Sequence, residues 1–248
     1  MNKQKWTMLL PHFVPVAGIL GALARWALYL SADDRTGLLP YGHAAQLILS
    51  LVSLLAIAII VLSCTPLKQA NKYRFNFPAS PIGAVGFGTA ATGMLVTGIG
   101  ELILGGDGLA TACALLSLPA AGILGFLAHC RFRGQKPSVL FGLGLCVYFM
   151  VYLVCRYRVW SANPQLEDYV FPLLASVCLL LASYQTAAFA ADSGSRRLYT
   201  AWRLAAGYFC LVSLPNCPSP VFYAAMAIWM FCNPCDHRPM PRKGRNVR

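Results

Sequence analysis

The stretch IGAVGFGTAATGMLVTGIGELIL, residues 82–104, decides the fold class. It carries no charged residue from 82 to 100, and a bilayer hydrocarbon core needs about 20 apolar residues per helix. Small residues spaced by four along it let a second helix approach closely, because packing holds helices together in lipid. We therefore predict a transmembrane helix with a close-packed face. Its glycines are Gly83, Gly86, Gly88, Gly93, Gly98 and Gly100.

The rest of the 248-residue chain has the same character. Hydrophobic residues make up 58% of the whole chain and charged residues 11%, whereas a soluble domain has about 25% charged residues. The apolar blocks predict an all-α, polytopic helix bundle that forms one integral membrane domain over residues 1–248. The predicted spans are 8–30, 44–62, 82–104, 109–128, 139–154, 169–191, 198–214 and 219–232. The last is the weakest, since about 14 residues reach only about 21 Å.

Charge predicts the orientation, because Lys and Arg of short loops stay on the cytoplasmic side. With eight spans, 15 of the 20 basic residues lie on the face that holds both termini, and Arg35, Arg156 and Arg158 lie on the other. We therefore expect both termini to be cytoplasmic and the protein to lie in the inner cell membrane. The net charge of +12 then reports topology, not nucleic-acid binding. The basic cytoplasmic tail, 233–248, is expected to contact anionic lipids.

The chain holds a possible internal repeat. PVAGILGALAR, 15–25, matches PAAGILGFLAH, 119–129, at eight of eleven positions. A true repeat would have inverted topology, as in many secondary transporters. The identity ends outside this stretch, so convergence of two close-packed helices is the alternative. In either case we predict that Gly18 and Gly122 face a neighbouring helix.

The ten cysteines do not indicate a disulfide framework, since several lie within spans, where Cys behaves as a small apolar residue. Cys232 and Cys235 form the one CxxC, followed by His237. With Cys64 and Cys130 they could complete a zinc site. The absence of a second CxxC favours the alternative, which is reduced, unpaired cysteines with no metal and no cofactor.

The sequence has no HExxH or GxSxG motif, and we predict that the protein is not an enzyme. Ionisable residues within spans then indicate function, because charges at membrane depth are costly. Arg25 and Glu101 lie about 7.5 Å and 4.5 Å below the ends of their helices, so we predict an ion pair. Asp33, Asp34 and His43 lie in the loop after the first predicted span. They would form the rim of a solute-binding cavity. The alternative is a structural ion pair below a loop whose acids end the first helix in solvent.

These features predict a small permease-like or transport-associated protein with a polar cavity that faces outward. The alternative is a non-catalytic membrane scaffold or accessory subunit that packs through glycine-rich helices. Its partners would then be other membrane helices or further copies of the chain, in addition to the lipid bilayer.

Overall fold

The computed structural model describes residues 3–31, 43–67, 69–105, 108–161, 169–215 and 217–235, with side chains from residue 10 onward. These residues form helices and connecting segments, with no strand among them. The helices are α1 (Lys3–Leu30), α2 (Ala44–Cys64), α3 (Tyr73–Asn76), α4 (Pro81–Leu104), α5 (Gly108–Arg133), α6 (Val139–Trp160), α7 (Val170–Ala190), α8 (Arg196–Val212) and α9 (Pro220–Cys232).

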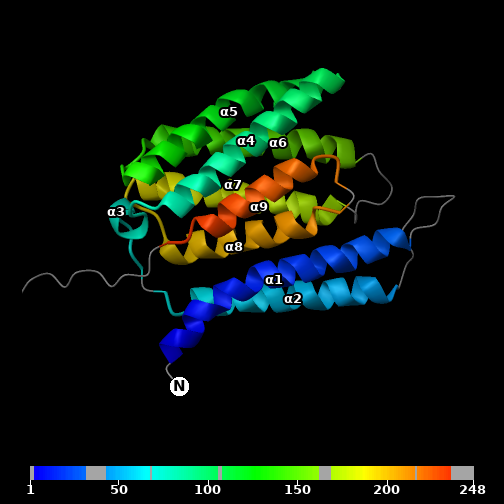
Figure 1. Cartoon of the computed structure of the whole chain (residues 1–248), viewed down its shortest axis with the longest axis horizontal. Helices are drawn as coiled ribbons and strands as arrows, with labels where there is room; N and C mark the ends of the chain where they lie inside the picture. Colours follow the sequence, from blue (N-terminus) through cyan, green and yellow to red (C-terminus); the bar gives the residue numbers. More distant parts are fainter. Residues whose placement is uncertain are drawn as a thin grey trace, which may run out of the picture.

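Each predicted span is a helix in the structure, and successive long helices run in opposite directions along the bundle (Figure 1). Six of them, α1, α2, α4, α5, α6 and α7, are long and apolar enough to cross a bilayer. The short helix α3 is an addition that apolar periodicity could not reveal, because it has only four residues. The structure therefore has the architecture of a multi-pass membrane protein.

Helices α8 and α9 have 17 and 13 residues and lie in the interior. Helix α8 contacts α1, α2, α7 and α9, and α9 contacts α4 and α8. On α9, Trp229 packs against Phe87 of α4 and stacks on Phe149 of α6, with ring centroids 5.3 and 6.4 Å apart. Neighbouring helices surround α8 and α9, which explains how these elements can be shorter than the rest.

The glycines of α4 give close helix packing, as predicted for this stretch. A Cβ atom on Gly86 would lie 2.7 Å from the Cβ of Cys232 on α9, and one on Gly93 would overlap Ala225 of the same helix. On the α5 side, a Cβ on Gly98 would overlap Ser117. Helix α4 therefore packs between α5 and α9 through its small residues.

The two copies of the GILG motif have different surroundings. Gly18 is buried, and a Cβ there would lie 2.7 Å from Leu211 Cδ1 on α8, which confirms the packing prediction for α1. The same prediction is wrong for α5, because Gly122 and Gly125 are exposed and have no atom within 4 Å of an added Cβ. The side of α5 that packs on α4 carries other residues, among them Ser117.

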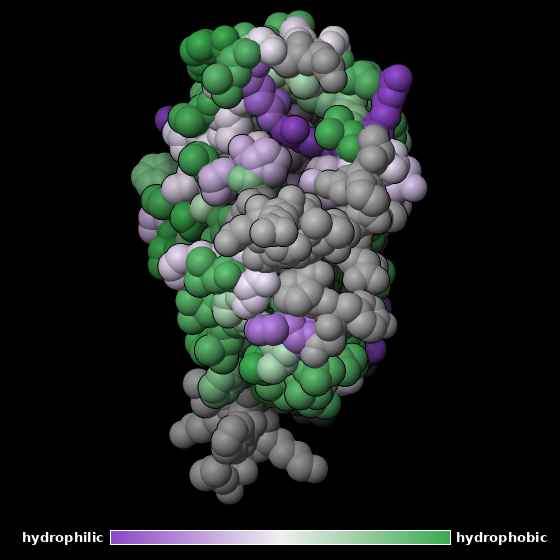
Figure 2. Space-filling model, turned by 90° about the vertical axis from the view of Figure 1, so that its right-hand side faces the viewer, coloured by the Kyte–Doolittle hydropathy of each residue, from purple (hydrophilic) through white to green (hydrophobic). Residues whose placement is uncertain are grey.

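The two ends of the bundle differ. The basic end comprises α3, the starts of α4, α6 and α8, and the ends of α5, α7 and α9. The opposite end holds the ends of α1, α4, α6 and α8. Figure 2 looks onto this opposite end, where hydrophilic side chains gather between hydrophobic flanks. The apolar flanks and the polar end fit a bundle that is surrounded by lipid along its length.

Candidate functional site

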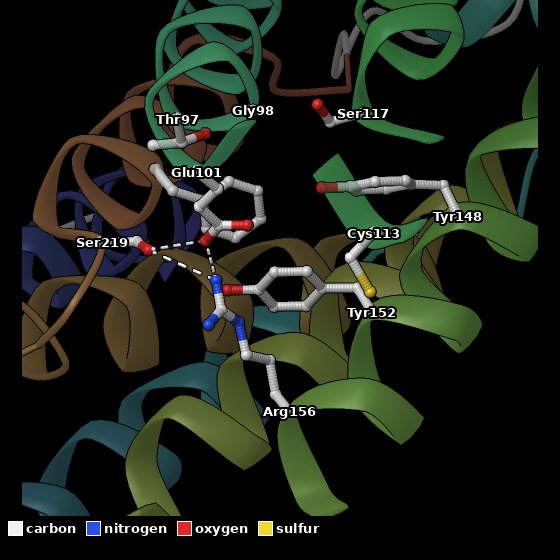
Figure 3. Close-up of a pocket in the computed structure, with 10 residues that line it drawn as sticks. Thr97, Gly98, Glu101, Cys113, Ser117, Tyr148, Tyr152, Arg156 and Ser219 are labelled. Atoms are coloured by element: carbon white, nitrogen blue, oxygen red, sulfur yellow. Dashed lines mark hydrogen bonds and ion pairs between the residues drawn. The ribbon is translucent and has the colours of Figure 1, made fainter. Parts of the chain in front are cut away.

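A small, partly enclosed polar pocket, with room for about one water molecule, lies at the opposite end of the bundle (Figure 3). Four helices or their flanking residues contribute to its wall. The lining residues are Thr97, Gly98 and Glu101 of α4, Cys113 and Ser117 of α5, Tyr148, Tyr152 and Arg156 of α6, and Ser219 and Phe222 at the start of α9. Hydroxyl, thiol, carboxylate and guanidinium groups therefore face one space at the end of an otherwise apolar bundle.

Helical spacing places these side chains together. Tyr148, Tyr152 and Arg156 are four residues apart, so they share one face of α6. Cys113 and Ser117 share a face of α5 for the same reason. The cavity is therefore lined by side chains from the inward-facing sides of adjacent helices.

An ion pair joins Glu101 and Arg156 across the cavity. The two side chains are only 24% and 16% exposed. Ser219 Oγ bridges them, since it accepts a hydrogen bond from Arg156 Nη2 at 3.5 Å and donates one to Glu101 Oε1 at 3.4 Å (Figure 3). The Arg156 guanidinium also lies over the Tyr152 ring, 5.2 Å from its centroid. Both charges are thus neutralised within the protein, as half-buried charges at membrane depth require.

Not every polar atom of the cavity forms a hydrogen bond within the protein. Arg156 Nε is buried and has no hydrogen-bond partner among the described residues. Buried donors without partners are uncommon in folded proteins. The site therefore has hydrogen-bonding capacity for a polar ligand or for water.

The predicted pairing of Arg25 with Glu101 is wrong. Arg25 donates hydrogen bonds to the carbonyl of Val212 and to the hydroxyl of Tyr29, both at 3.0 Å. It also lies 5.3 Å from the centroid of the Phe171 ring. The cause is helix order, because α1 packs against α2 and α8, whereas α4 packs against α5 and α9. Similar depth along two helices did not make them neighbours.

Arg25 lines a second pocket at the same end, with room for a few water molecules. Aromatic rings dominate its wall, and Trp160 stacks on Tyr169 with ring centroids 5.4 Å apart. Cys217 and Pro218 close this cavity, while Ser219, the next residue, lines the first cavity. Burial raises the pKa of the Cys217 thiol, so the thiol stays neutral near neutral pH. The connector between α8 and α9 therefore borders both cavities.

The other predicted rim residues are placed only in part. His43 precedes α2 and caps it, because its Nδ1 accepts a hydrogen bond from the backbone amide of Ala45 at 3.2 Å. Asp33 and Asp34 lie outside the described residues. Solute binding by Arg25, Glu101, Asp33, Asp34 and His43 stays a prediction, with Glu101 now facing Arg156.

Of the four cysteines considered as zinc ligands, Cys130 and Cys235 are buried and Cys64 and Cys232 are partly exposed. Cys235 packs with Tyr73, Phe77, Phe189 and Tyr199 in a small buried cluster. The described part of the chain contains no group of three or more His, Cys, Asp or Glu residues placed to hold a metal ion. His237 lies outside the described residues.

Arg156 is a residue of the candidate site that the sequence analysis does not predict. The predicted span ends at 154 and leaves Arg156 outside it, whereas α6 continues to Trp160. The signal was present in the spacing of four between Tyr148, Tyr152 and Arg156. If the predicted span is extended to 160, Arg156 lies on the same helix face as Tyr148 and Tyr152.

Comparison of the chain with protein-family models, with curated proteins and with solved structures finds no match. Function must therefore be argued from the site and not from the fold. The fold supports an integral membrane protein.

Proposed function

We propose that the chain is a small permease-like or transport-associated protein, and that the cavity at Glu101 and Arg156 binds a small polar solute. The observation that carries the proposal is the half-buried ion pair on the wall of a small polar pocket. Ionisable groups at membrane depth are expensive and commonly mark substrate paths. The proposed role is binding and passage without chemical conversion.

The chemistry of the cavity favours solutes with hydrogen-bonding and charged groups. An anionic group of the solute would replace Glu101 on the Arg156 guanidinium, and a cationic group would replace Arg156 on Glu101. Tyr148, Ser117 and Thr97 would supply further hydroxyl groups. Such exchange keeps each buried charge paired during binding, so its cost in free energy is limited.

The proposal includes eight membrane crossings, with both termini cytoplasmic and the cavity open to the outside of the inner membrane. The distribution of basic residues supports this orientation. The basic tail, 233–248, would then meet anionic lipids of the inner leaflet. Helices α8 and α9 would complete the crossings inside the bundle.

A membrane scaffold or accessory subunit is the second candidate function. The specific observation in its favour is the open face of α5 at Gly122 and Gly125, where a partner helix or another copy of the chain would find room. Under this proposal the Glu101–Arg156 pair is a structural link between α4 and α6.

Uptake of labelled solutes tests the two functions. Cells that lack the gene, with and without the restored wild-type chain, would be given a panel of labelled amino acids, organic acids and inorganic ions. We expect the chain to restore uptake of at least one solute, and Glu101→Gln to abolish it with normal membrane abundance. Asp192→Asn is the matched control, because it makes the same change at an exposed ion pair of the basic end. If no solute distinguishes the two strains, the transport proposal fails. Partner loss in a Gly122→Leu variant would then favour the scaffold.

A further inference from the structure

Three arginines are buried at the basic end of the bundle. Arg131 lies near the end of α5, Arg196 begins α8, and Arg203 lies two turns further along α8. Their exposed fractions are 3%, 5% and 4%. They lie on the side opposite to Glu101 and Arg156 and are not part of the cavity described above.

Two of these arginines hold the connector between α2 and α4. Arg131 Nη1 donates a hydrogen bond to the carbonyl of Pro78 at 2.7 Å, and the guanidinium lies 5.0 Å from the centroid of the Phe77 ring. Arg196 Nε donates to Asn76 Oδ1 at 2.7 Å. These contacts are all with neutral groups, so they orient the two guanidinium groups without neutralising them.

The third arginine contacts the last turn of α9. Arg203 Nη1 donates to the carbonyl of Met230 at 2.7 Å, which places a cation at the negative end of the helix dipole. Tyr199, one turn before Arg203, donates from its hydroxyl to the carbonyl of Asn233 at 3.1 Å. The Tyr199 ring packs on Phe77 with centroids 5.2 Å apart, and the Arg131 guanidinium lies 5.0 Å from the centroid of the same Phe77 ring. Tyr199 therefore links the α8 and α5 sides of this region.

Hydrogen-bonding groups without partners concentrate here. Among the described residues, eight buried side-chain nitrogen or oxygen atoms have no partner, and five of them belong to this region. They are Arg131 Nε, Arg196 Nη2, Arg203 Nε, Thr200 Oγ1 and Asn233 Oδ1. Each of the three arginines thus retains one buried N–H that lacks an acceptor, which is unusual for a donor on a charged group.

No described carboxylate neutralises the three arginines. The structure describes two carboxylates, and Glu101 is paired with Arg156 at the far end. The other, Asp192, is 44% exposed and binds Lys136 and the backbone amide of Tyr73. Burying several positive charges without a counter-ion is strongly unfavourable. An anion from outside the described residues would remove this cost.

We propose that Arg131, Arg196 and Arg203 form a binding site for a phosphate group. Phosphate oxygens accept several charge-assisted hydrogen bonds at once, and guanidinium groups are well suited to donate them. The end of a membrane bundle lies at the depth of lipid headgroups, where basic pockets between helices bind phospholipids. The ligand is either an anionic phospholipid headgroup or a soluble phosphate. This site does not depend on the function proposed for the Glu101 cavity.

Thermal unfolding of the delipidated protein in neutral detergent tests the proposal. The probes are inorganic phosphate, sodium chloride at matched ionic strength, short-chain phosphatidylglycerol and short-chain phosphatidylcholine. We expect phosphatidylglycerol or phosphate to raise the Tm of the wild type, with little effect of chloride or phosphatidylcholine. Arg131→Gln and Arg196→Gln should each weaken the apparent affinity roughly tenfold or more, because each removes a charge-assisted hydrogen bond. Arg133→Gln is the matched control, since Arg133 is exposed on the same helix.

The probes also identify the source of the phosphate group. A response to phosphatidylglycerol alone assigns a lipid headgroup, and a response to inorganic phosphate assigns a soluble ligand. If a Gln variant does not fold, Arg131→Lys and native mass spectrometry of phospholipid that copurifies with the wild type take its place. The proposal is overturned if the wild type responds equally to chloride, or if the Arg131 and Arg133 variants respond alike. It also fails if the wild type shows no response and Asp236→Asn alone destabilises it, because a carboxylate of the chain would then be the counter-ion.

Discussion

The GILG motif occurs twice, and the structure predicts opposite effects for the same substitution in the two copies. Gly18→Ala adds a Cβ that would lie 2.7 Å from Leu211 Cδ1 and 3.1 Å from Leu211 Cβ. Gly122→Ala adds a Cβ with no neighbouring atom within 4 Å. The flanking residues Ile, Leu and Gly are the same in both helices, so local sequence contributes little to the difference.

The expected magnitudes follow from the two environments. Overpacking at a well-packed contact costs about 1–3 kcal/mol, and replacement of a helical glycine by alanine returns about 0.5–1 kcal/mol. Gly18→Ala should therefore lower the free energy of unfolding by about 1–2 kcal/mol. Gly122→Ala should raise the free energy of unfolding by about 0.5–1 kcal/mol, because alanine loses less backbone conformational entropy on folding than glycine and meets no neighbouring atom here. At about 2–4 °C per kcal/mol for a chain of this size, the two variants should differ in Tm by roughly 5–10 °C.

The measurement is thermal unfolding of both variants in the same neutral detergent. Gly21→Ala is a second test of the α1 interface, since its Cβ would lie 2.8 Å from Val212 Cγ2. Its Tm should fall together with that of Gly18→Ala. Equal Tm values for the Gly18 and Gly122 variants, or a larger loss at Gly122, would refute the packing described for α1 and α5.

Three further predictions concern topology and the basic end. Thiol labelling of Lys136→Cys and Asp107→Cys should occur from opposite sides of the membrane, and labelling from one side would contradict eight crossings. Hydrogen bonds from Lys136 and from the Tyr73 amide lower the pKa of Asp192. The stabilisation is therefore complete above the usual carboxyl pKa of about 4 and is lost as pH falls through the lower folded-state pKa. Because both side chains are over 40% exposed, Asp192→Asn should cost less than about 1 kcal/mol at pH 7 and nothing in strong acid, as chemical denaturation at each pH would show. Phe77→Ala removes a ring that contacts Arg131 and packs 5.2 Å from Tyr199, so denaturation should show a loss of about 3 kcal/mol or more, and a loss below 1 kcal/mol would contradict the packing.

The helices could be predicted from the sequence because their signal is local. An apolar run of about 20 residues reports a spanning helix wherever its neighbours lie. The ranges 44–62 and 82–104 match α2 and α4 within two residues at each end. The end of α6 was missed because Arg156 and Arg158 interrupt its hydropathy, although the helix continues through them.

The partners of the functional residues could not be predicted, because depth is only one of the coordinates that decide a contact. Arg25 and Glu101 are close in depth, but the helices that carry them are not neighbours. The choice of neighbours depends on which faces pack, and the two GILG motifs show that one motif serves both a buried and an exposed face. Glu101 itself was found because a carboxylate within a span is a strong signal on its own.

Helix α9 connects the two charged regions of the molecule. Ser219, directly before it, contacts the Glu101–Arg156 pair, and Asn233, directly after it, lies beside the buried Arg131 at Gly83. Its 13 residues span about 20 Å at 1.5 Å per residue. The two regions are therefore the two ends of one central helix.

The packing between these regions constrains the transport proposal. Met226 and Trp229 of α9 are 0% and 2% exposed, so the centre of the bundle is filled with apolar side chains. Under the transport proposal, passage along α9 would require α9 to move relative to α4, because these side chains fill the space beside it. That contact combines small residues such as Gly93 and Ala225 with the Phe87–Trp229 ring contact. A scaffold needs no such movement, so a transporter should be impaired by larger residues at this contact that leave the fold intact.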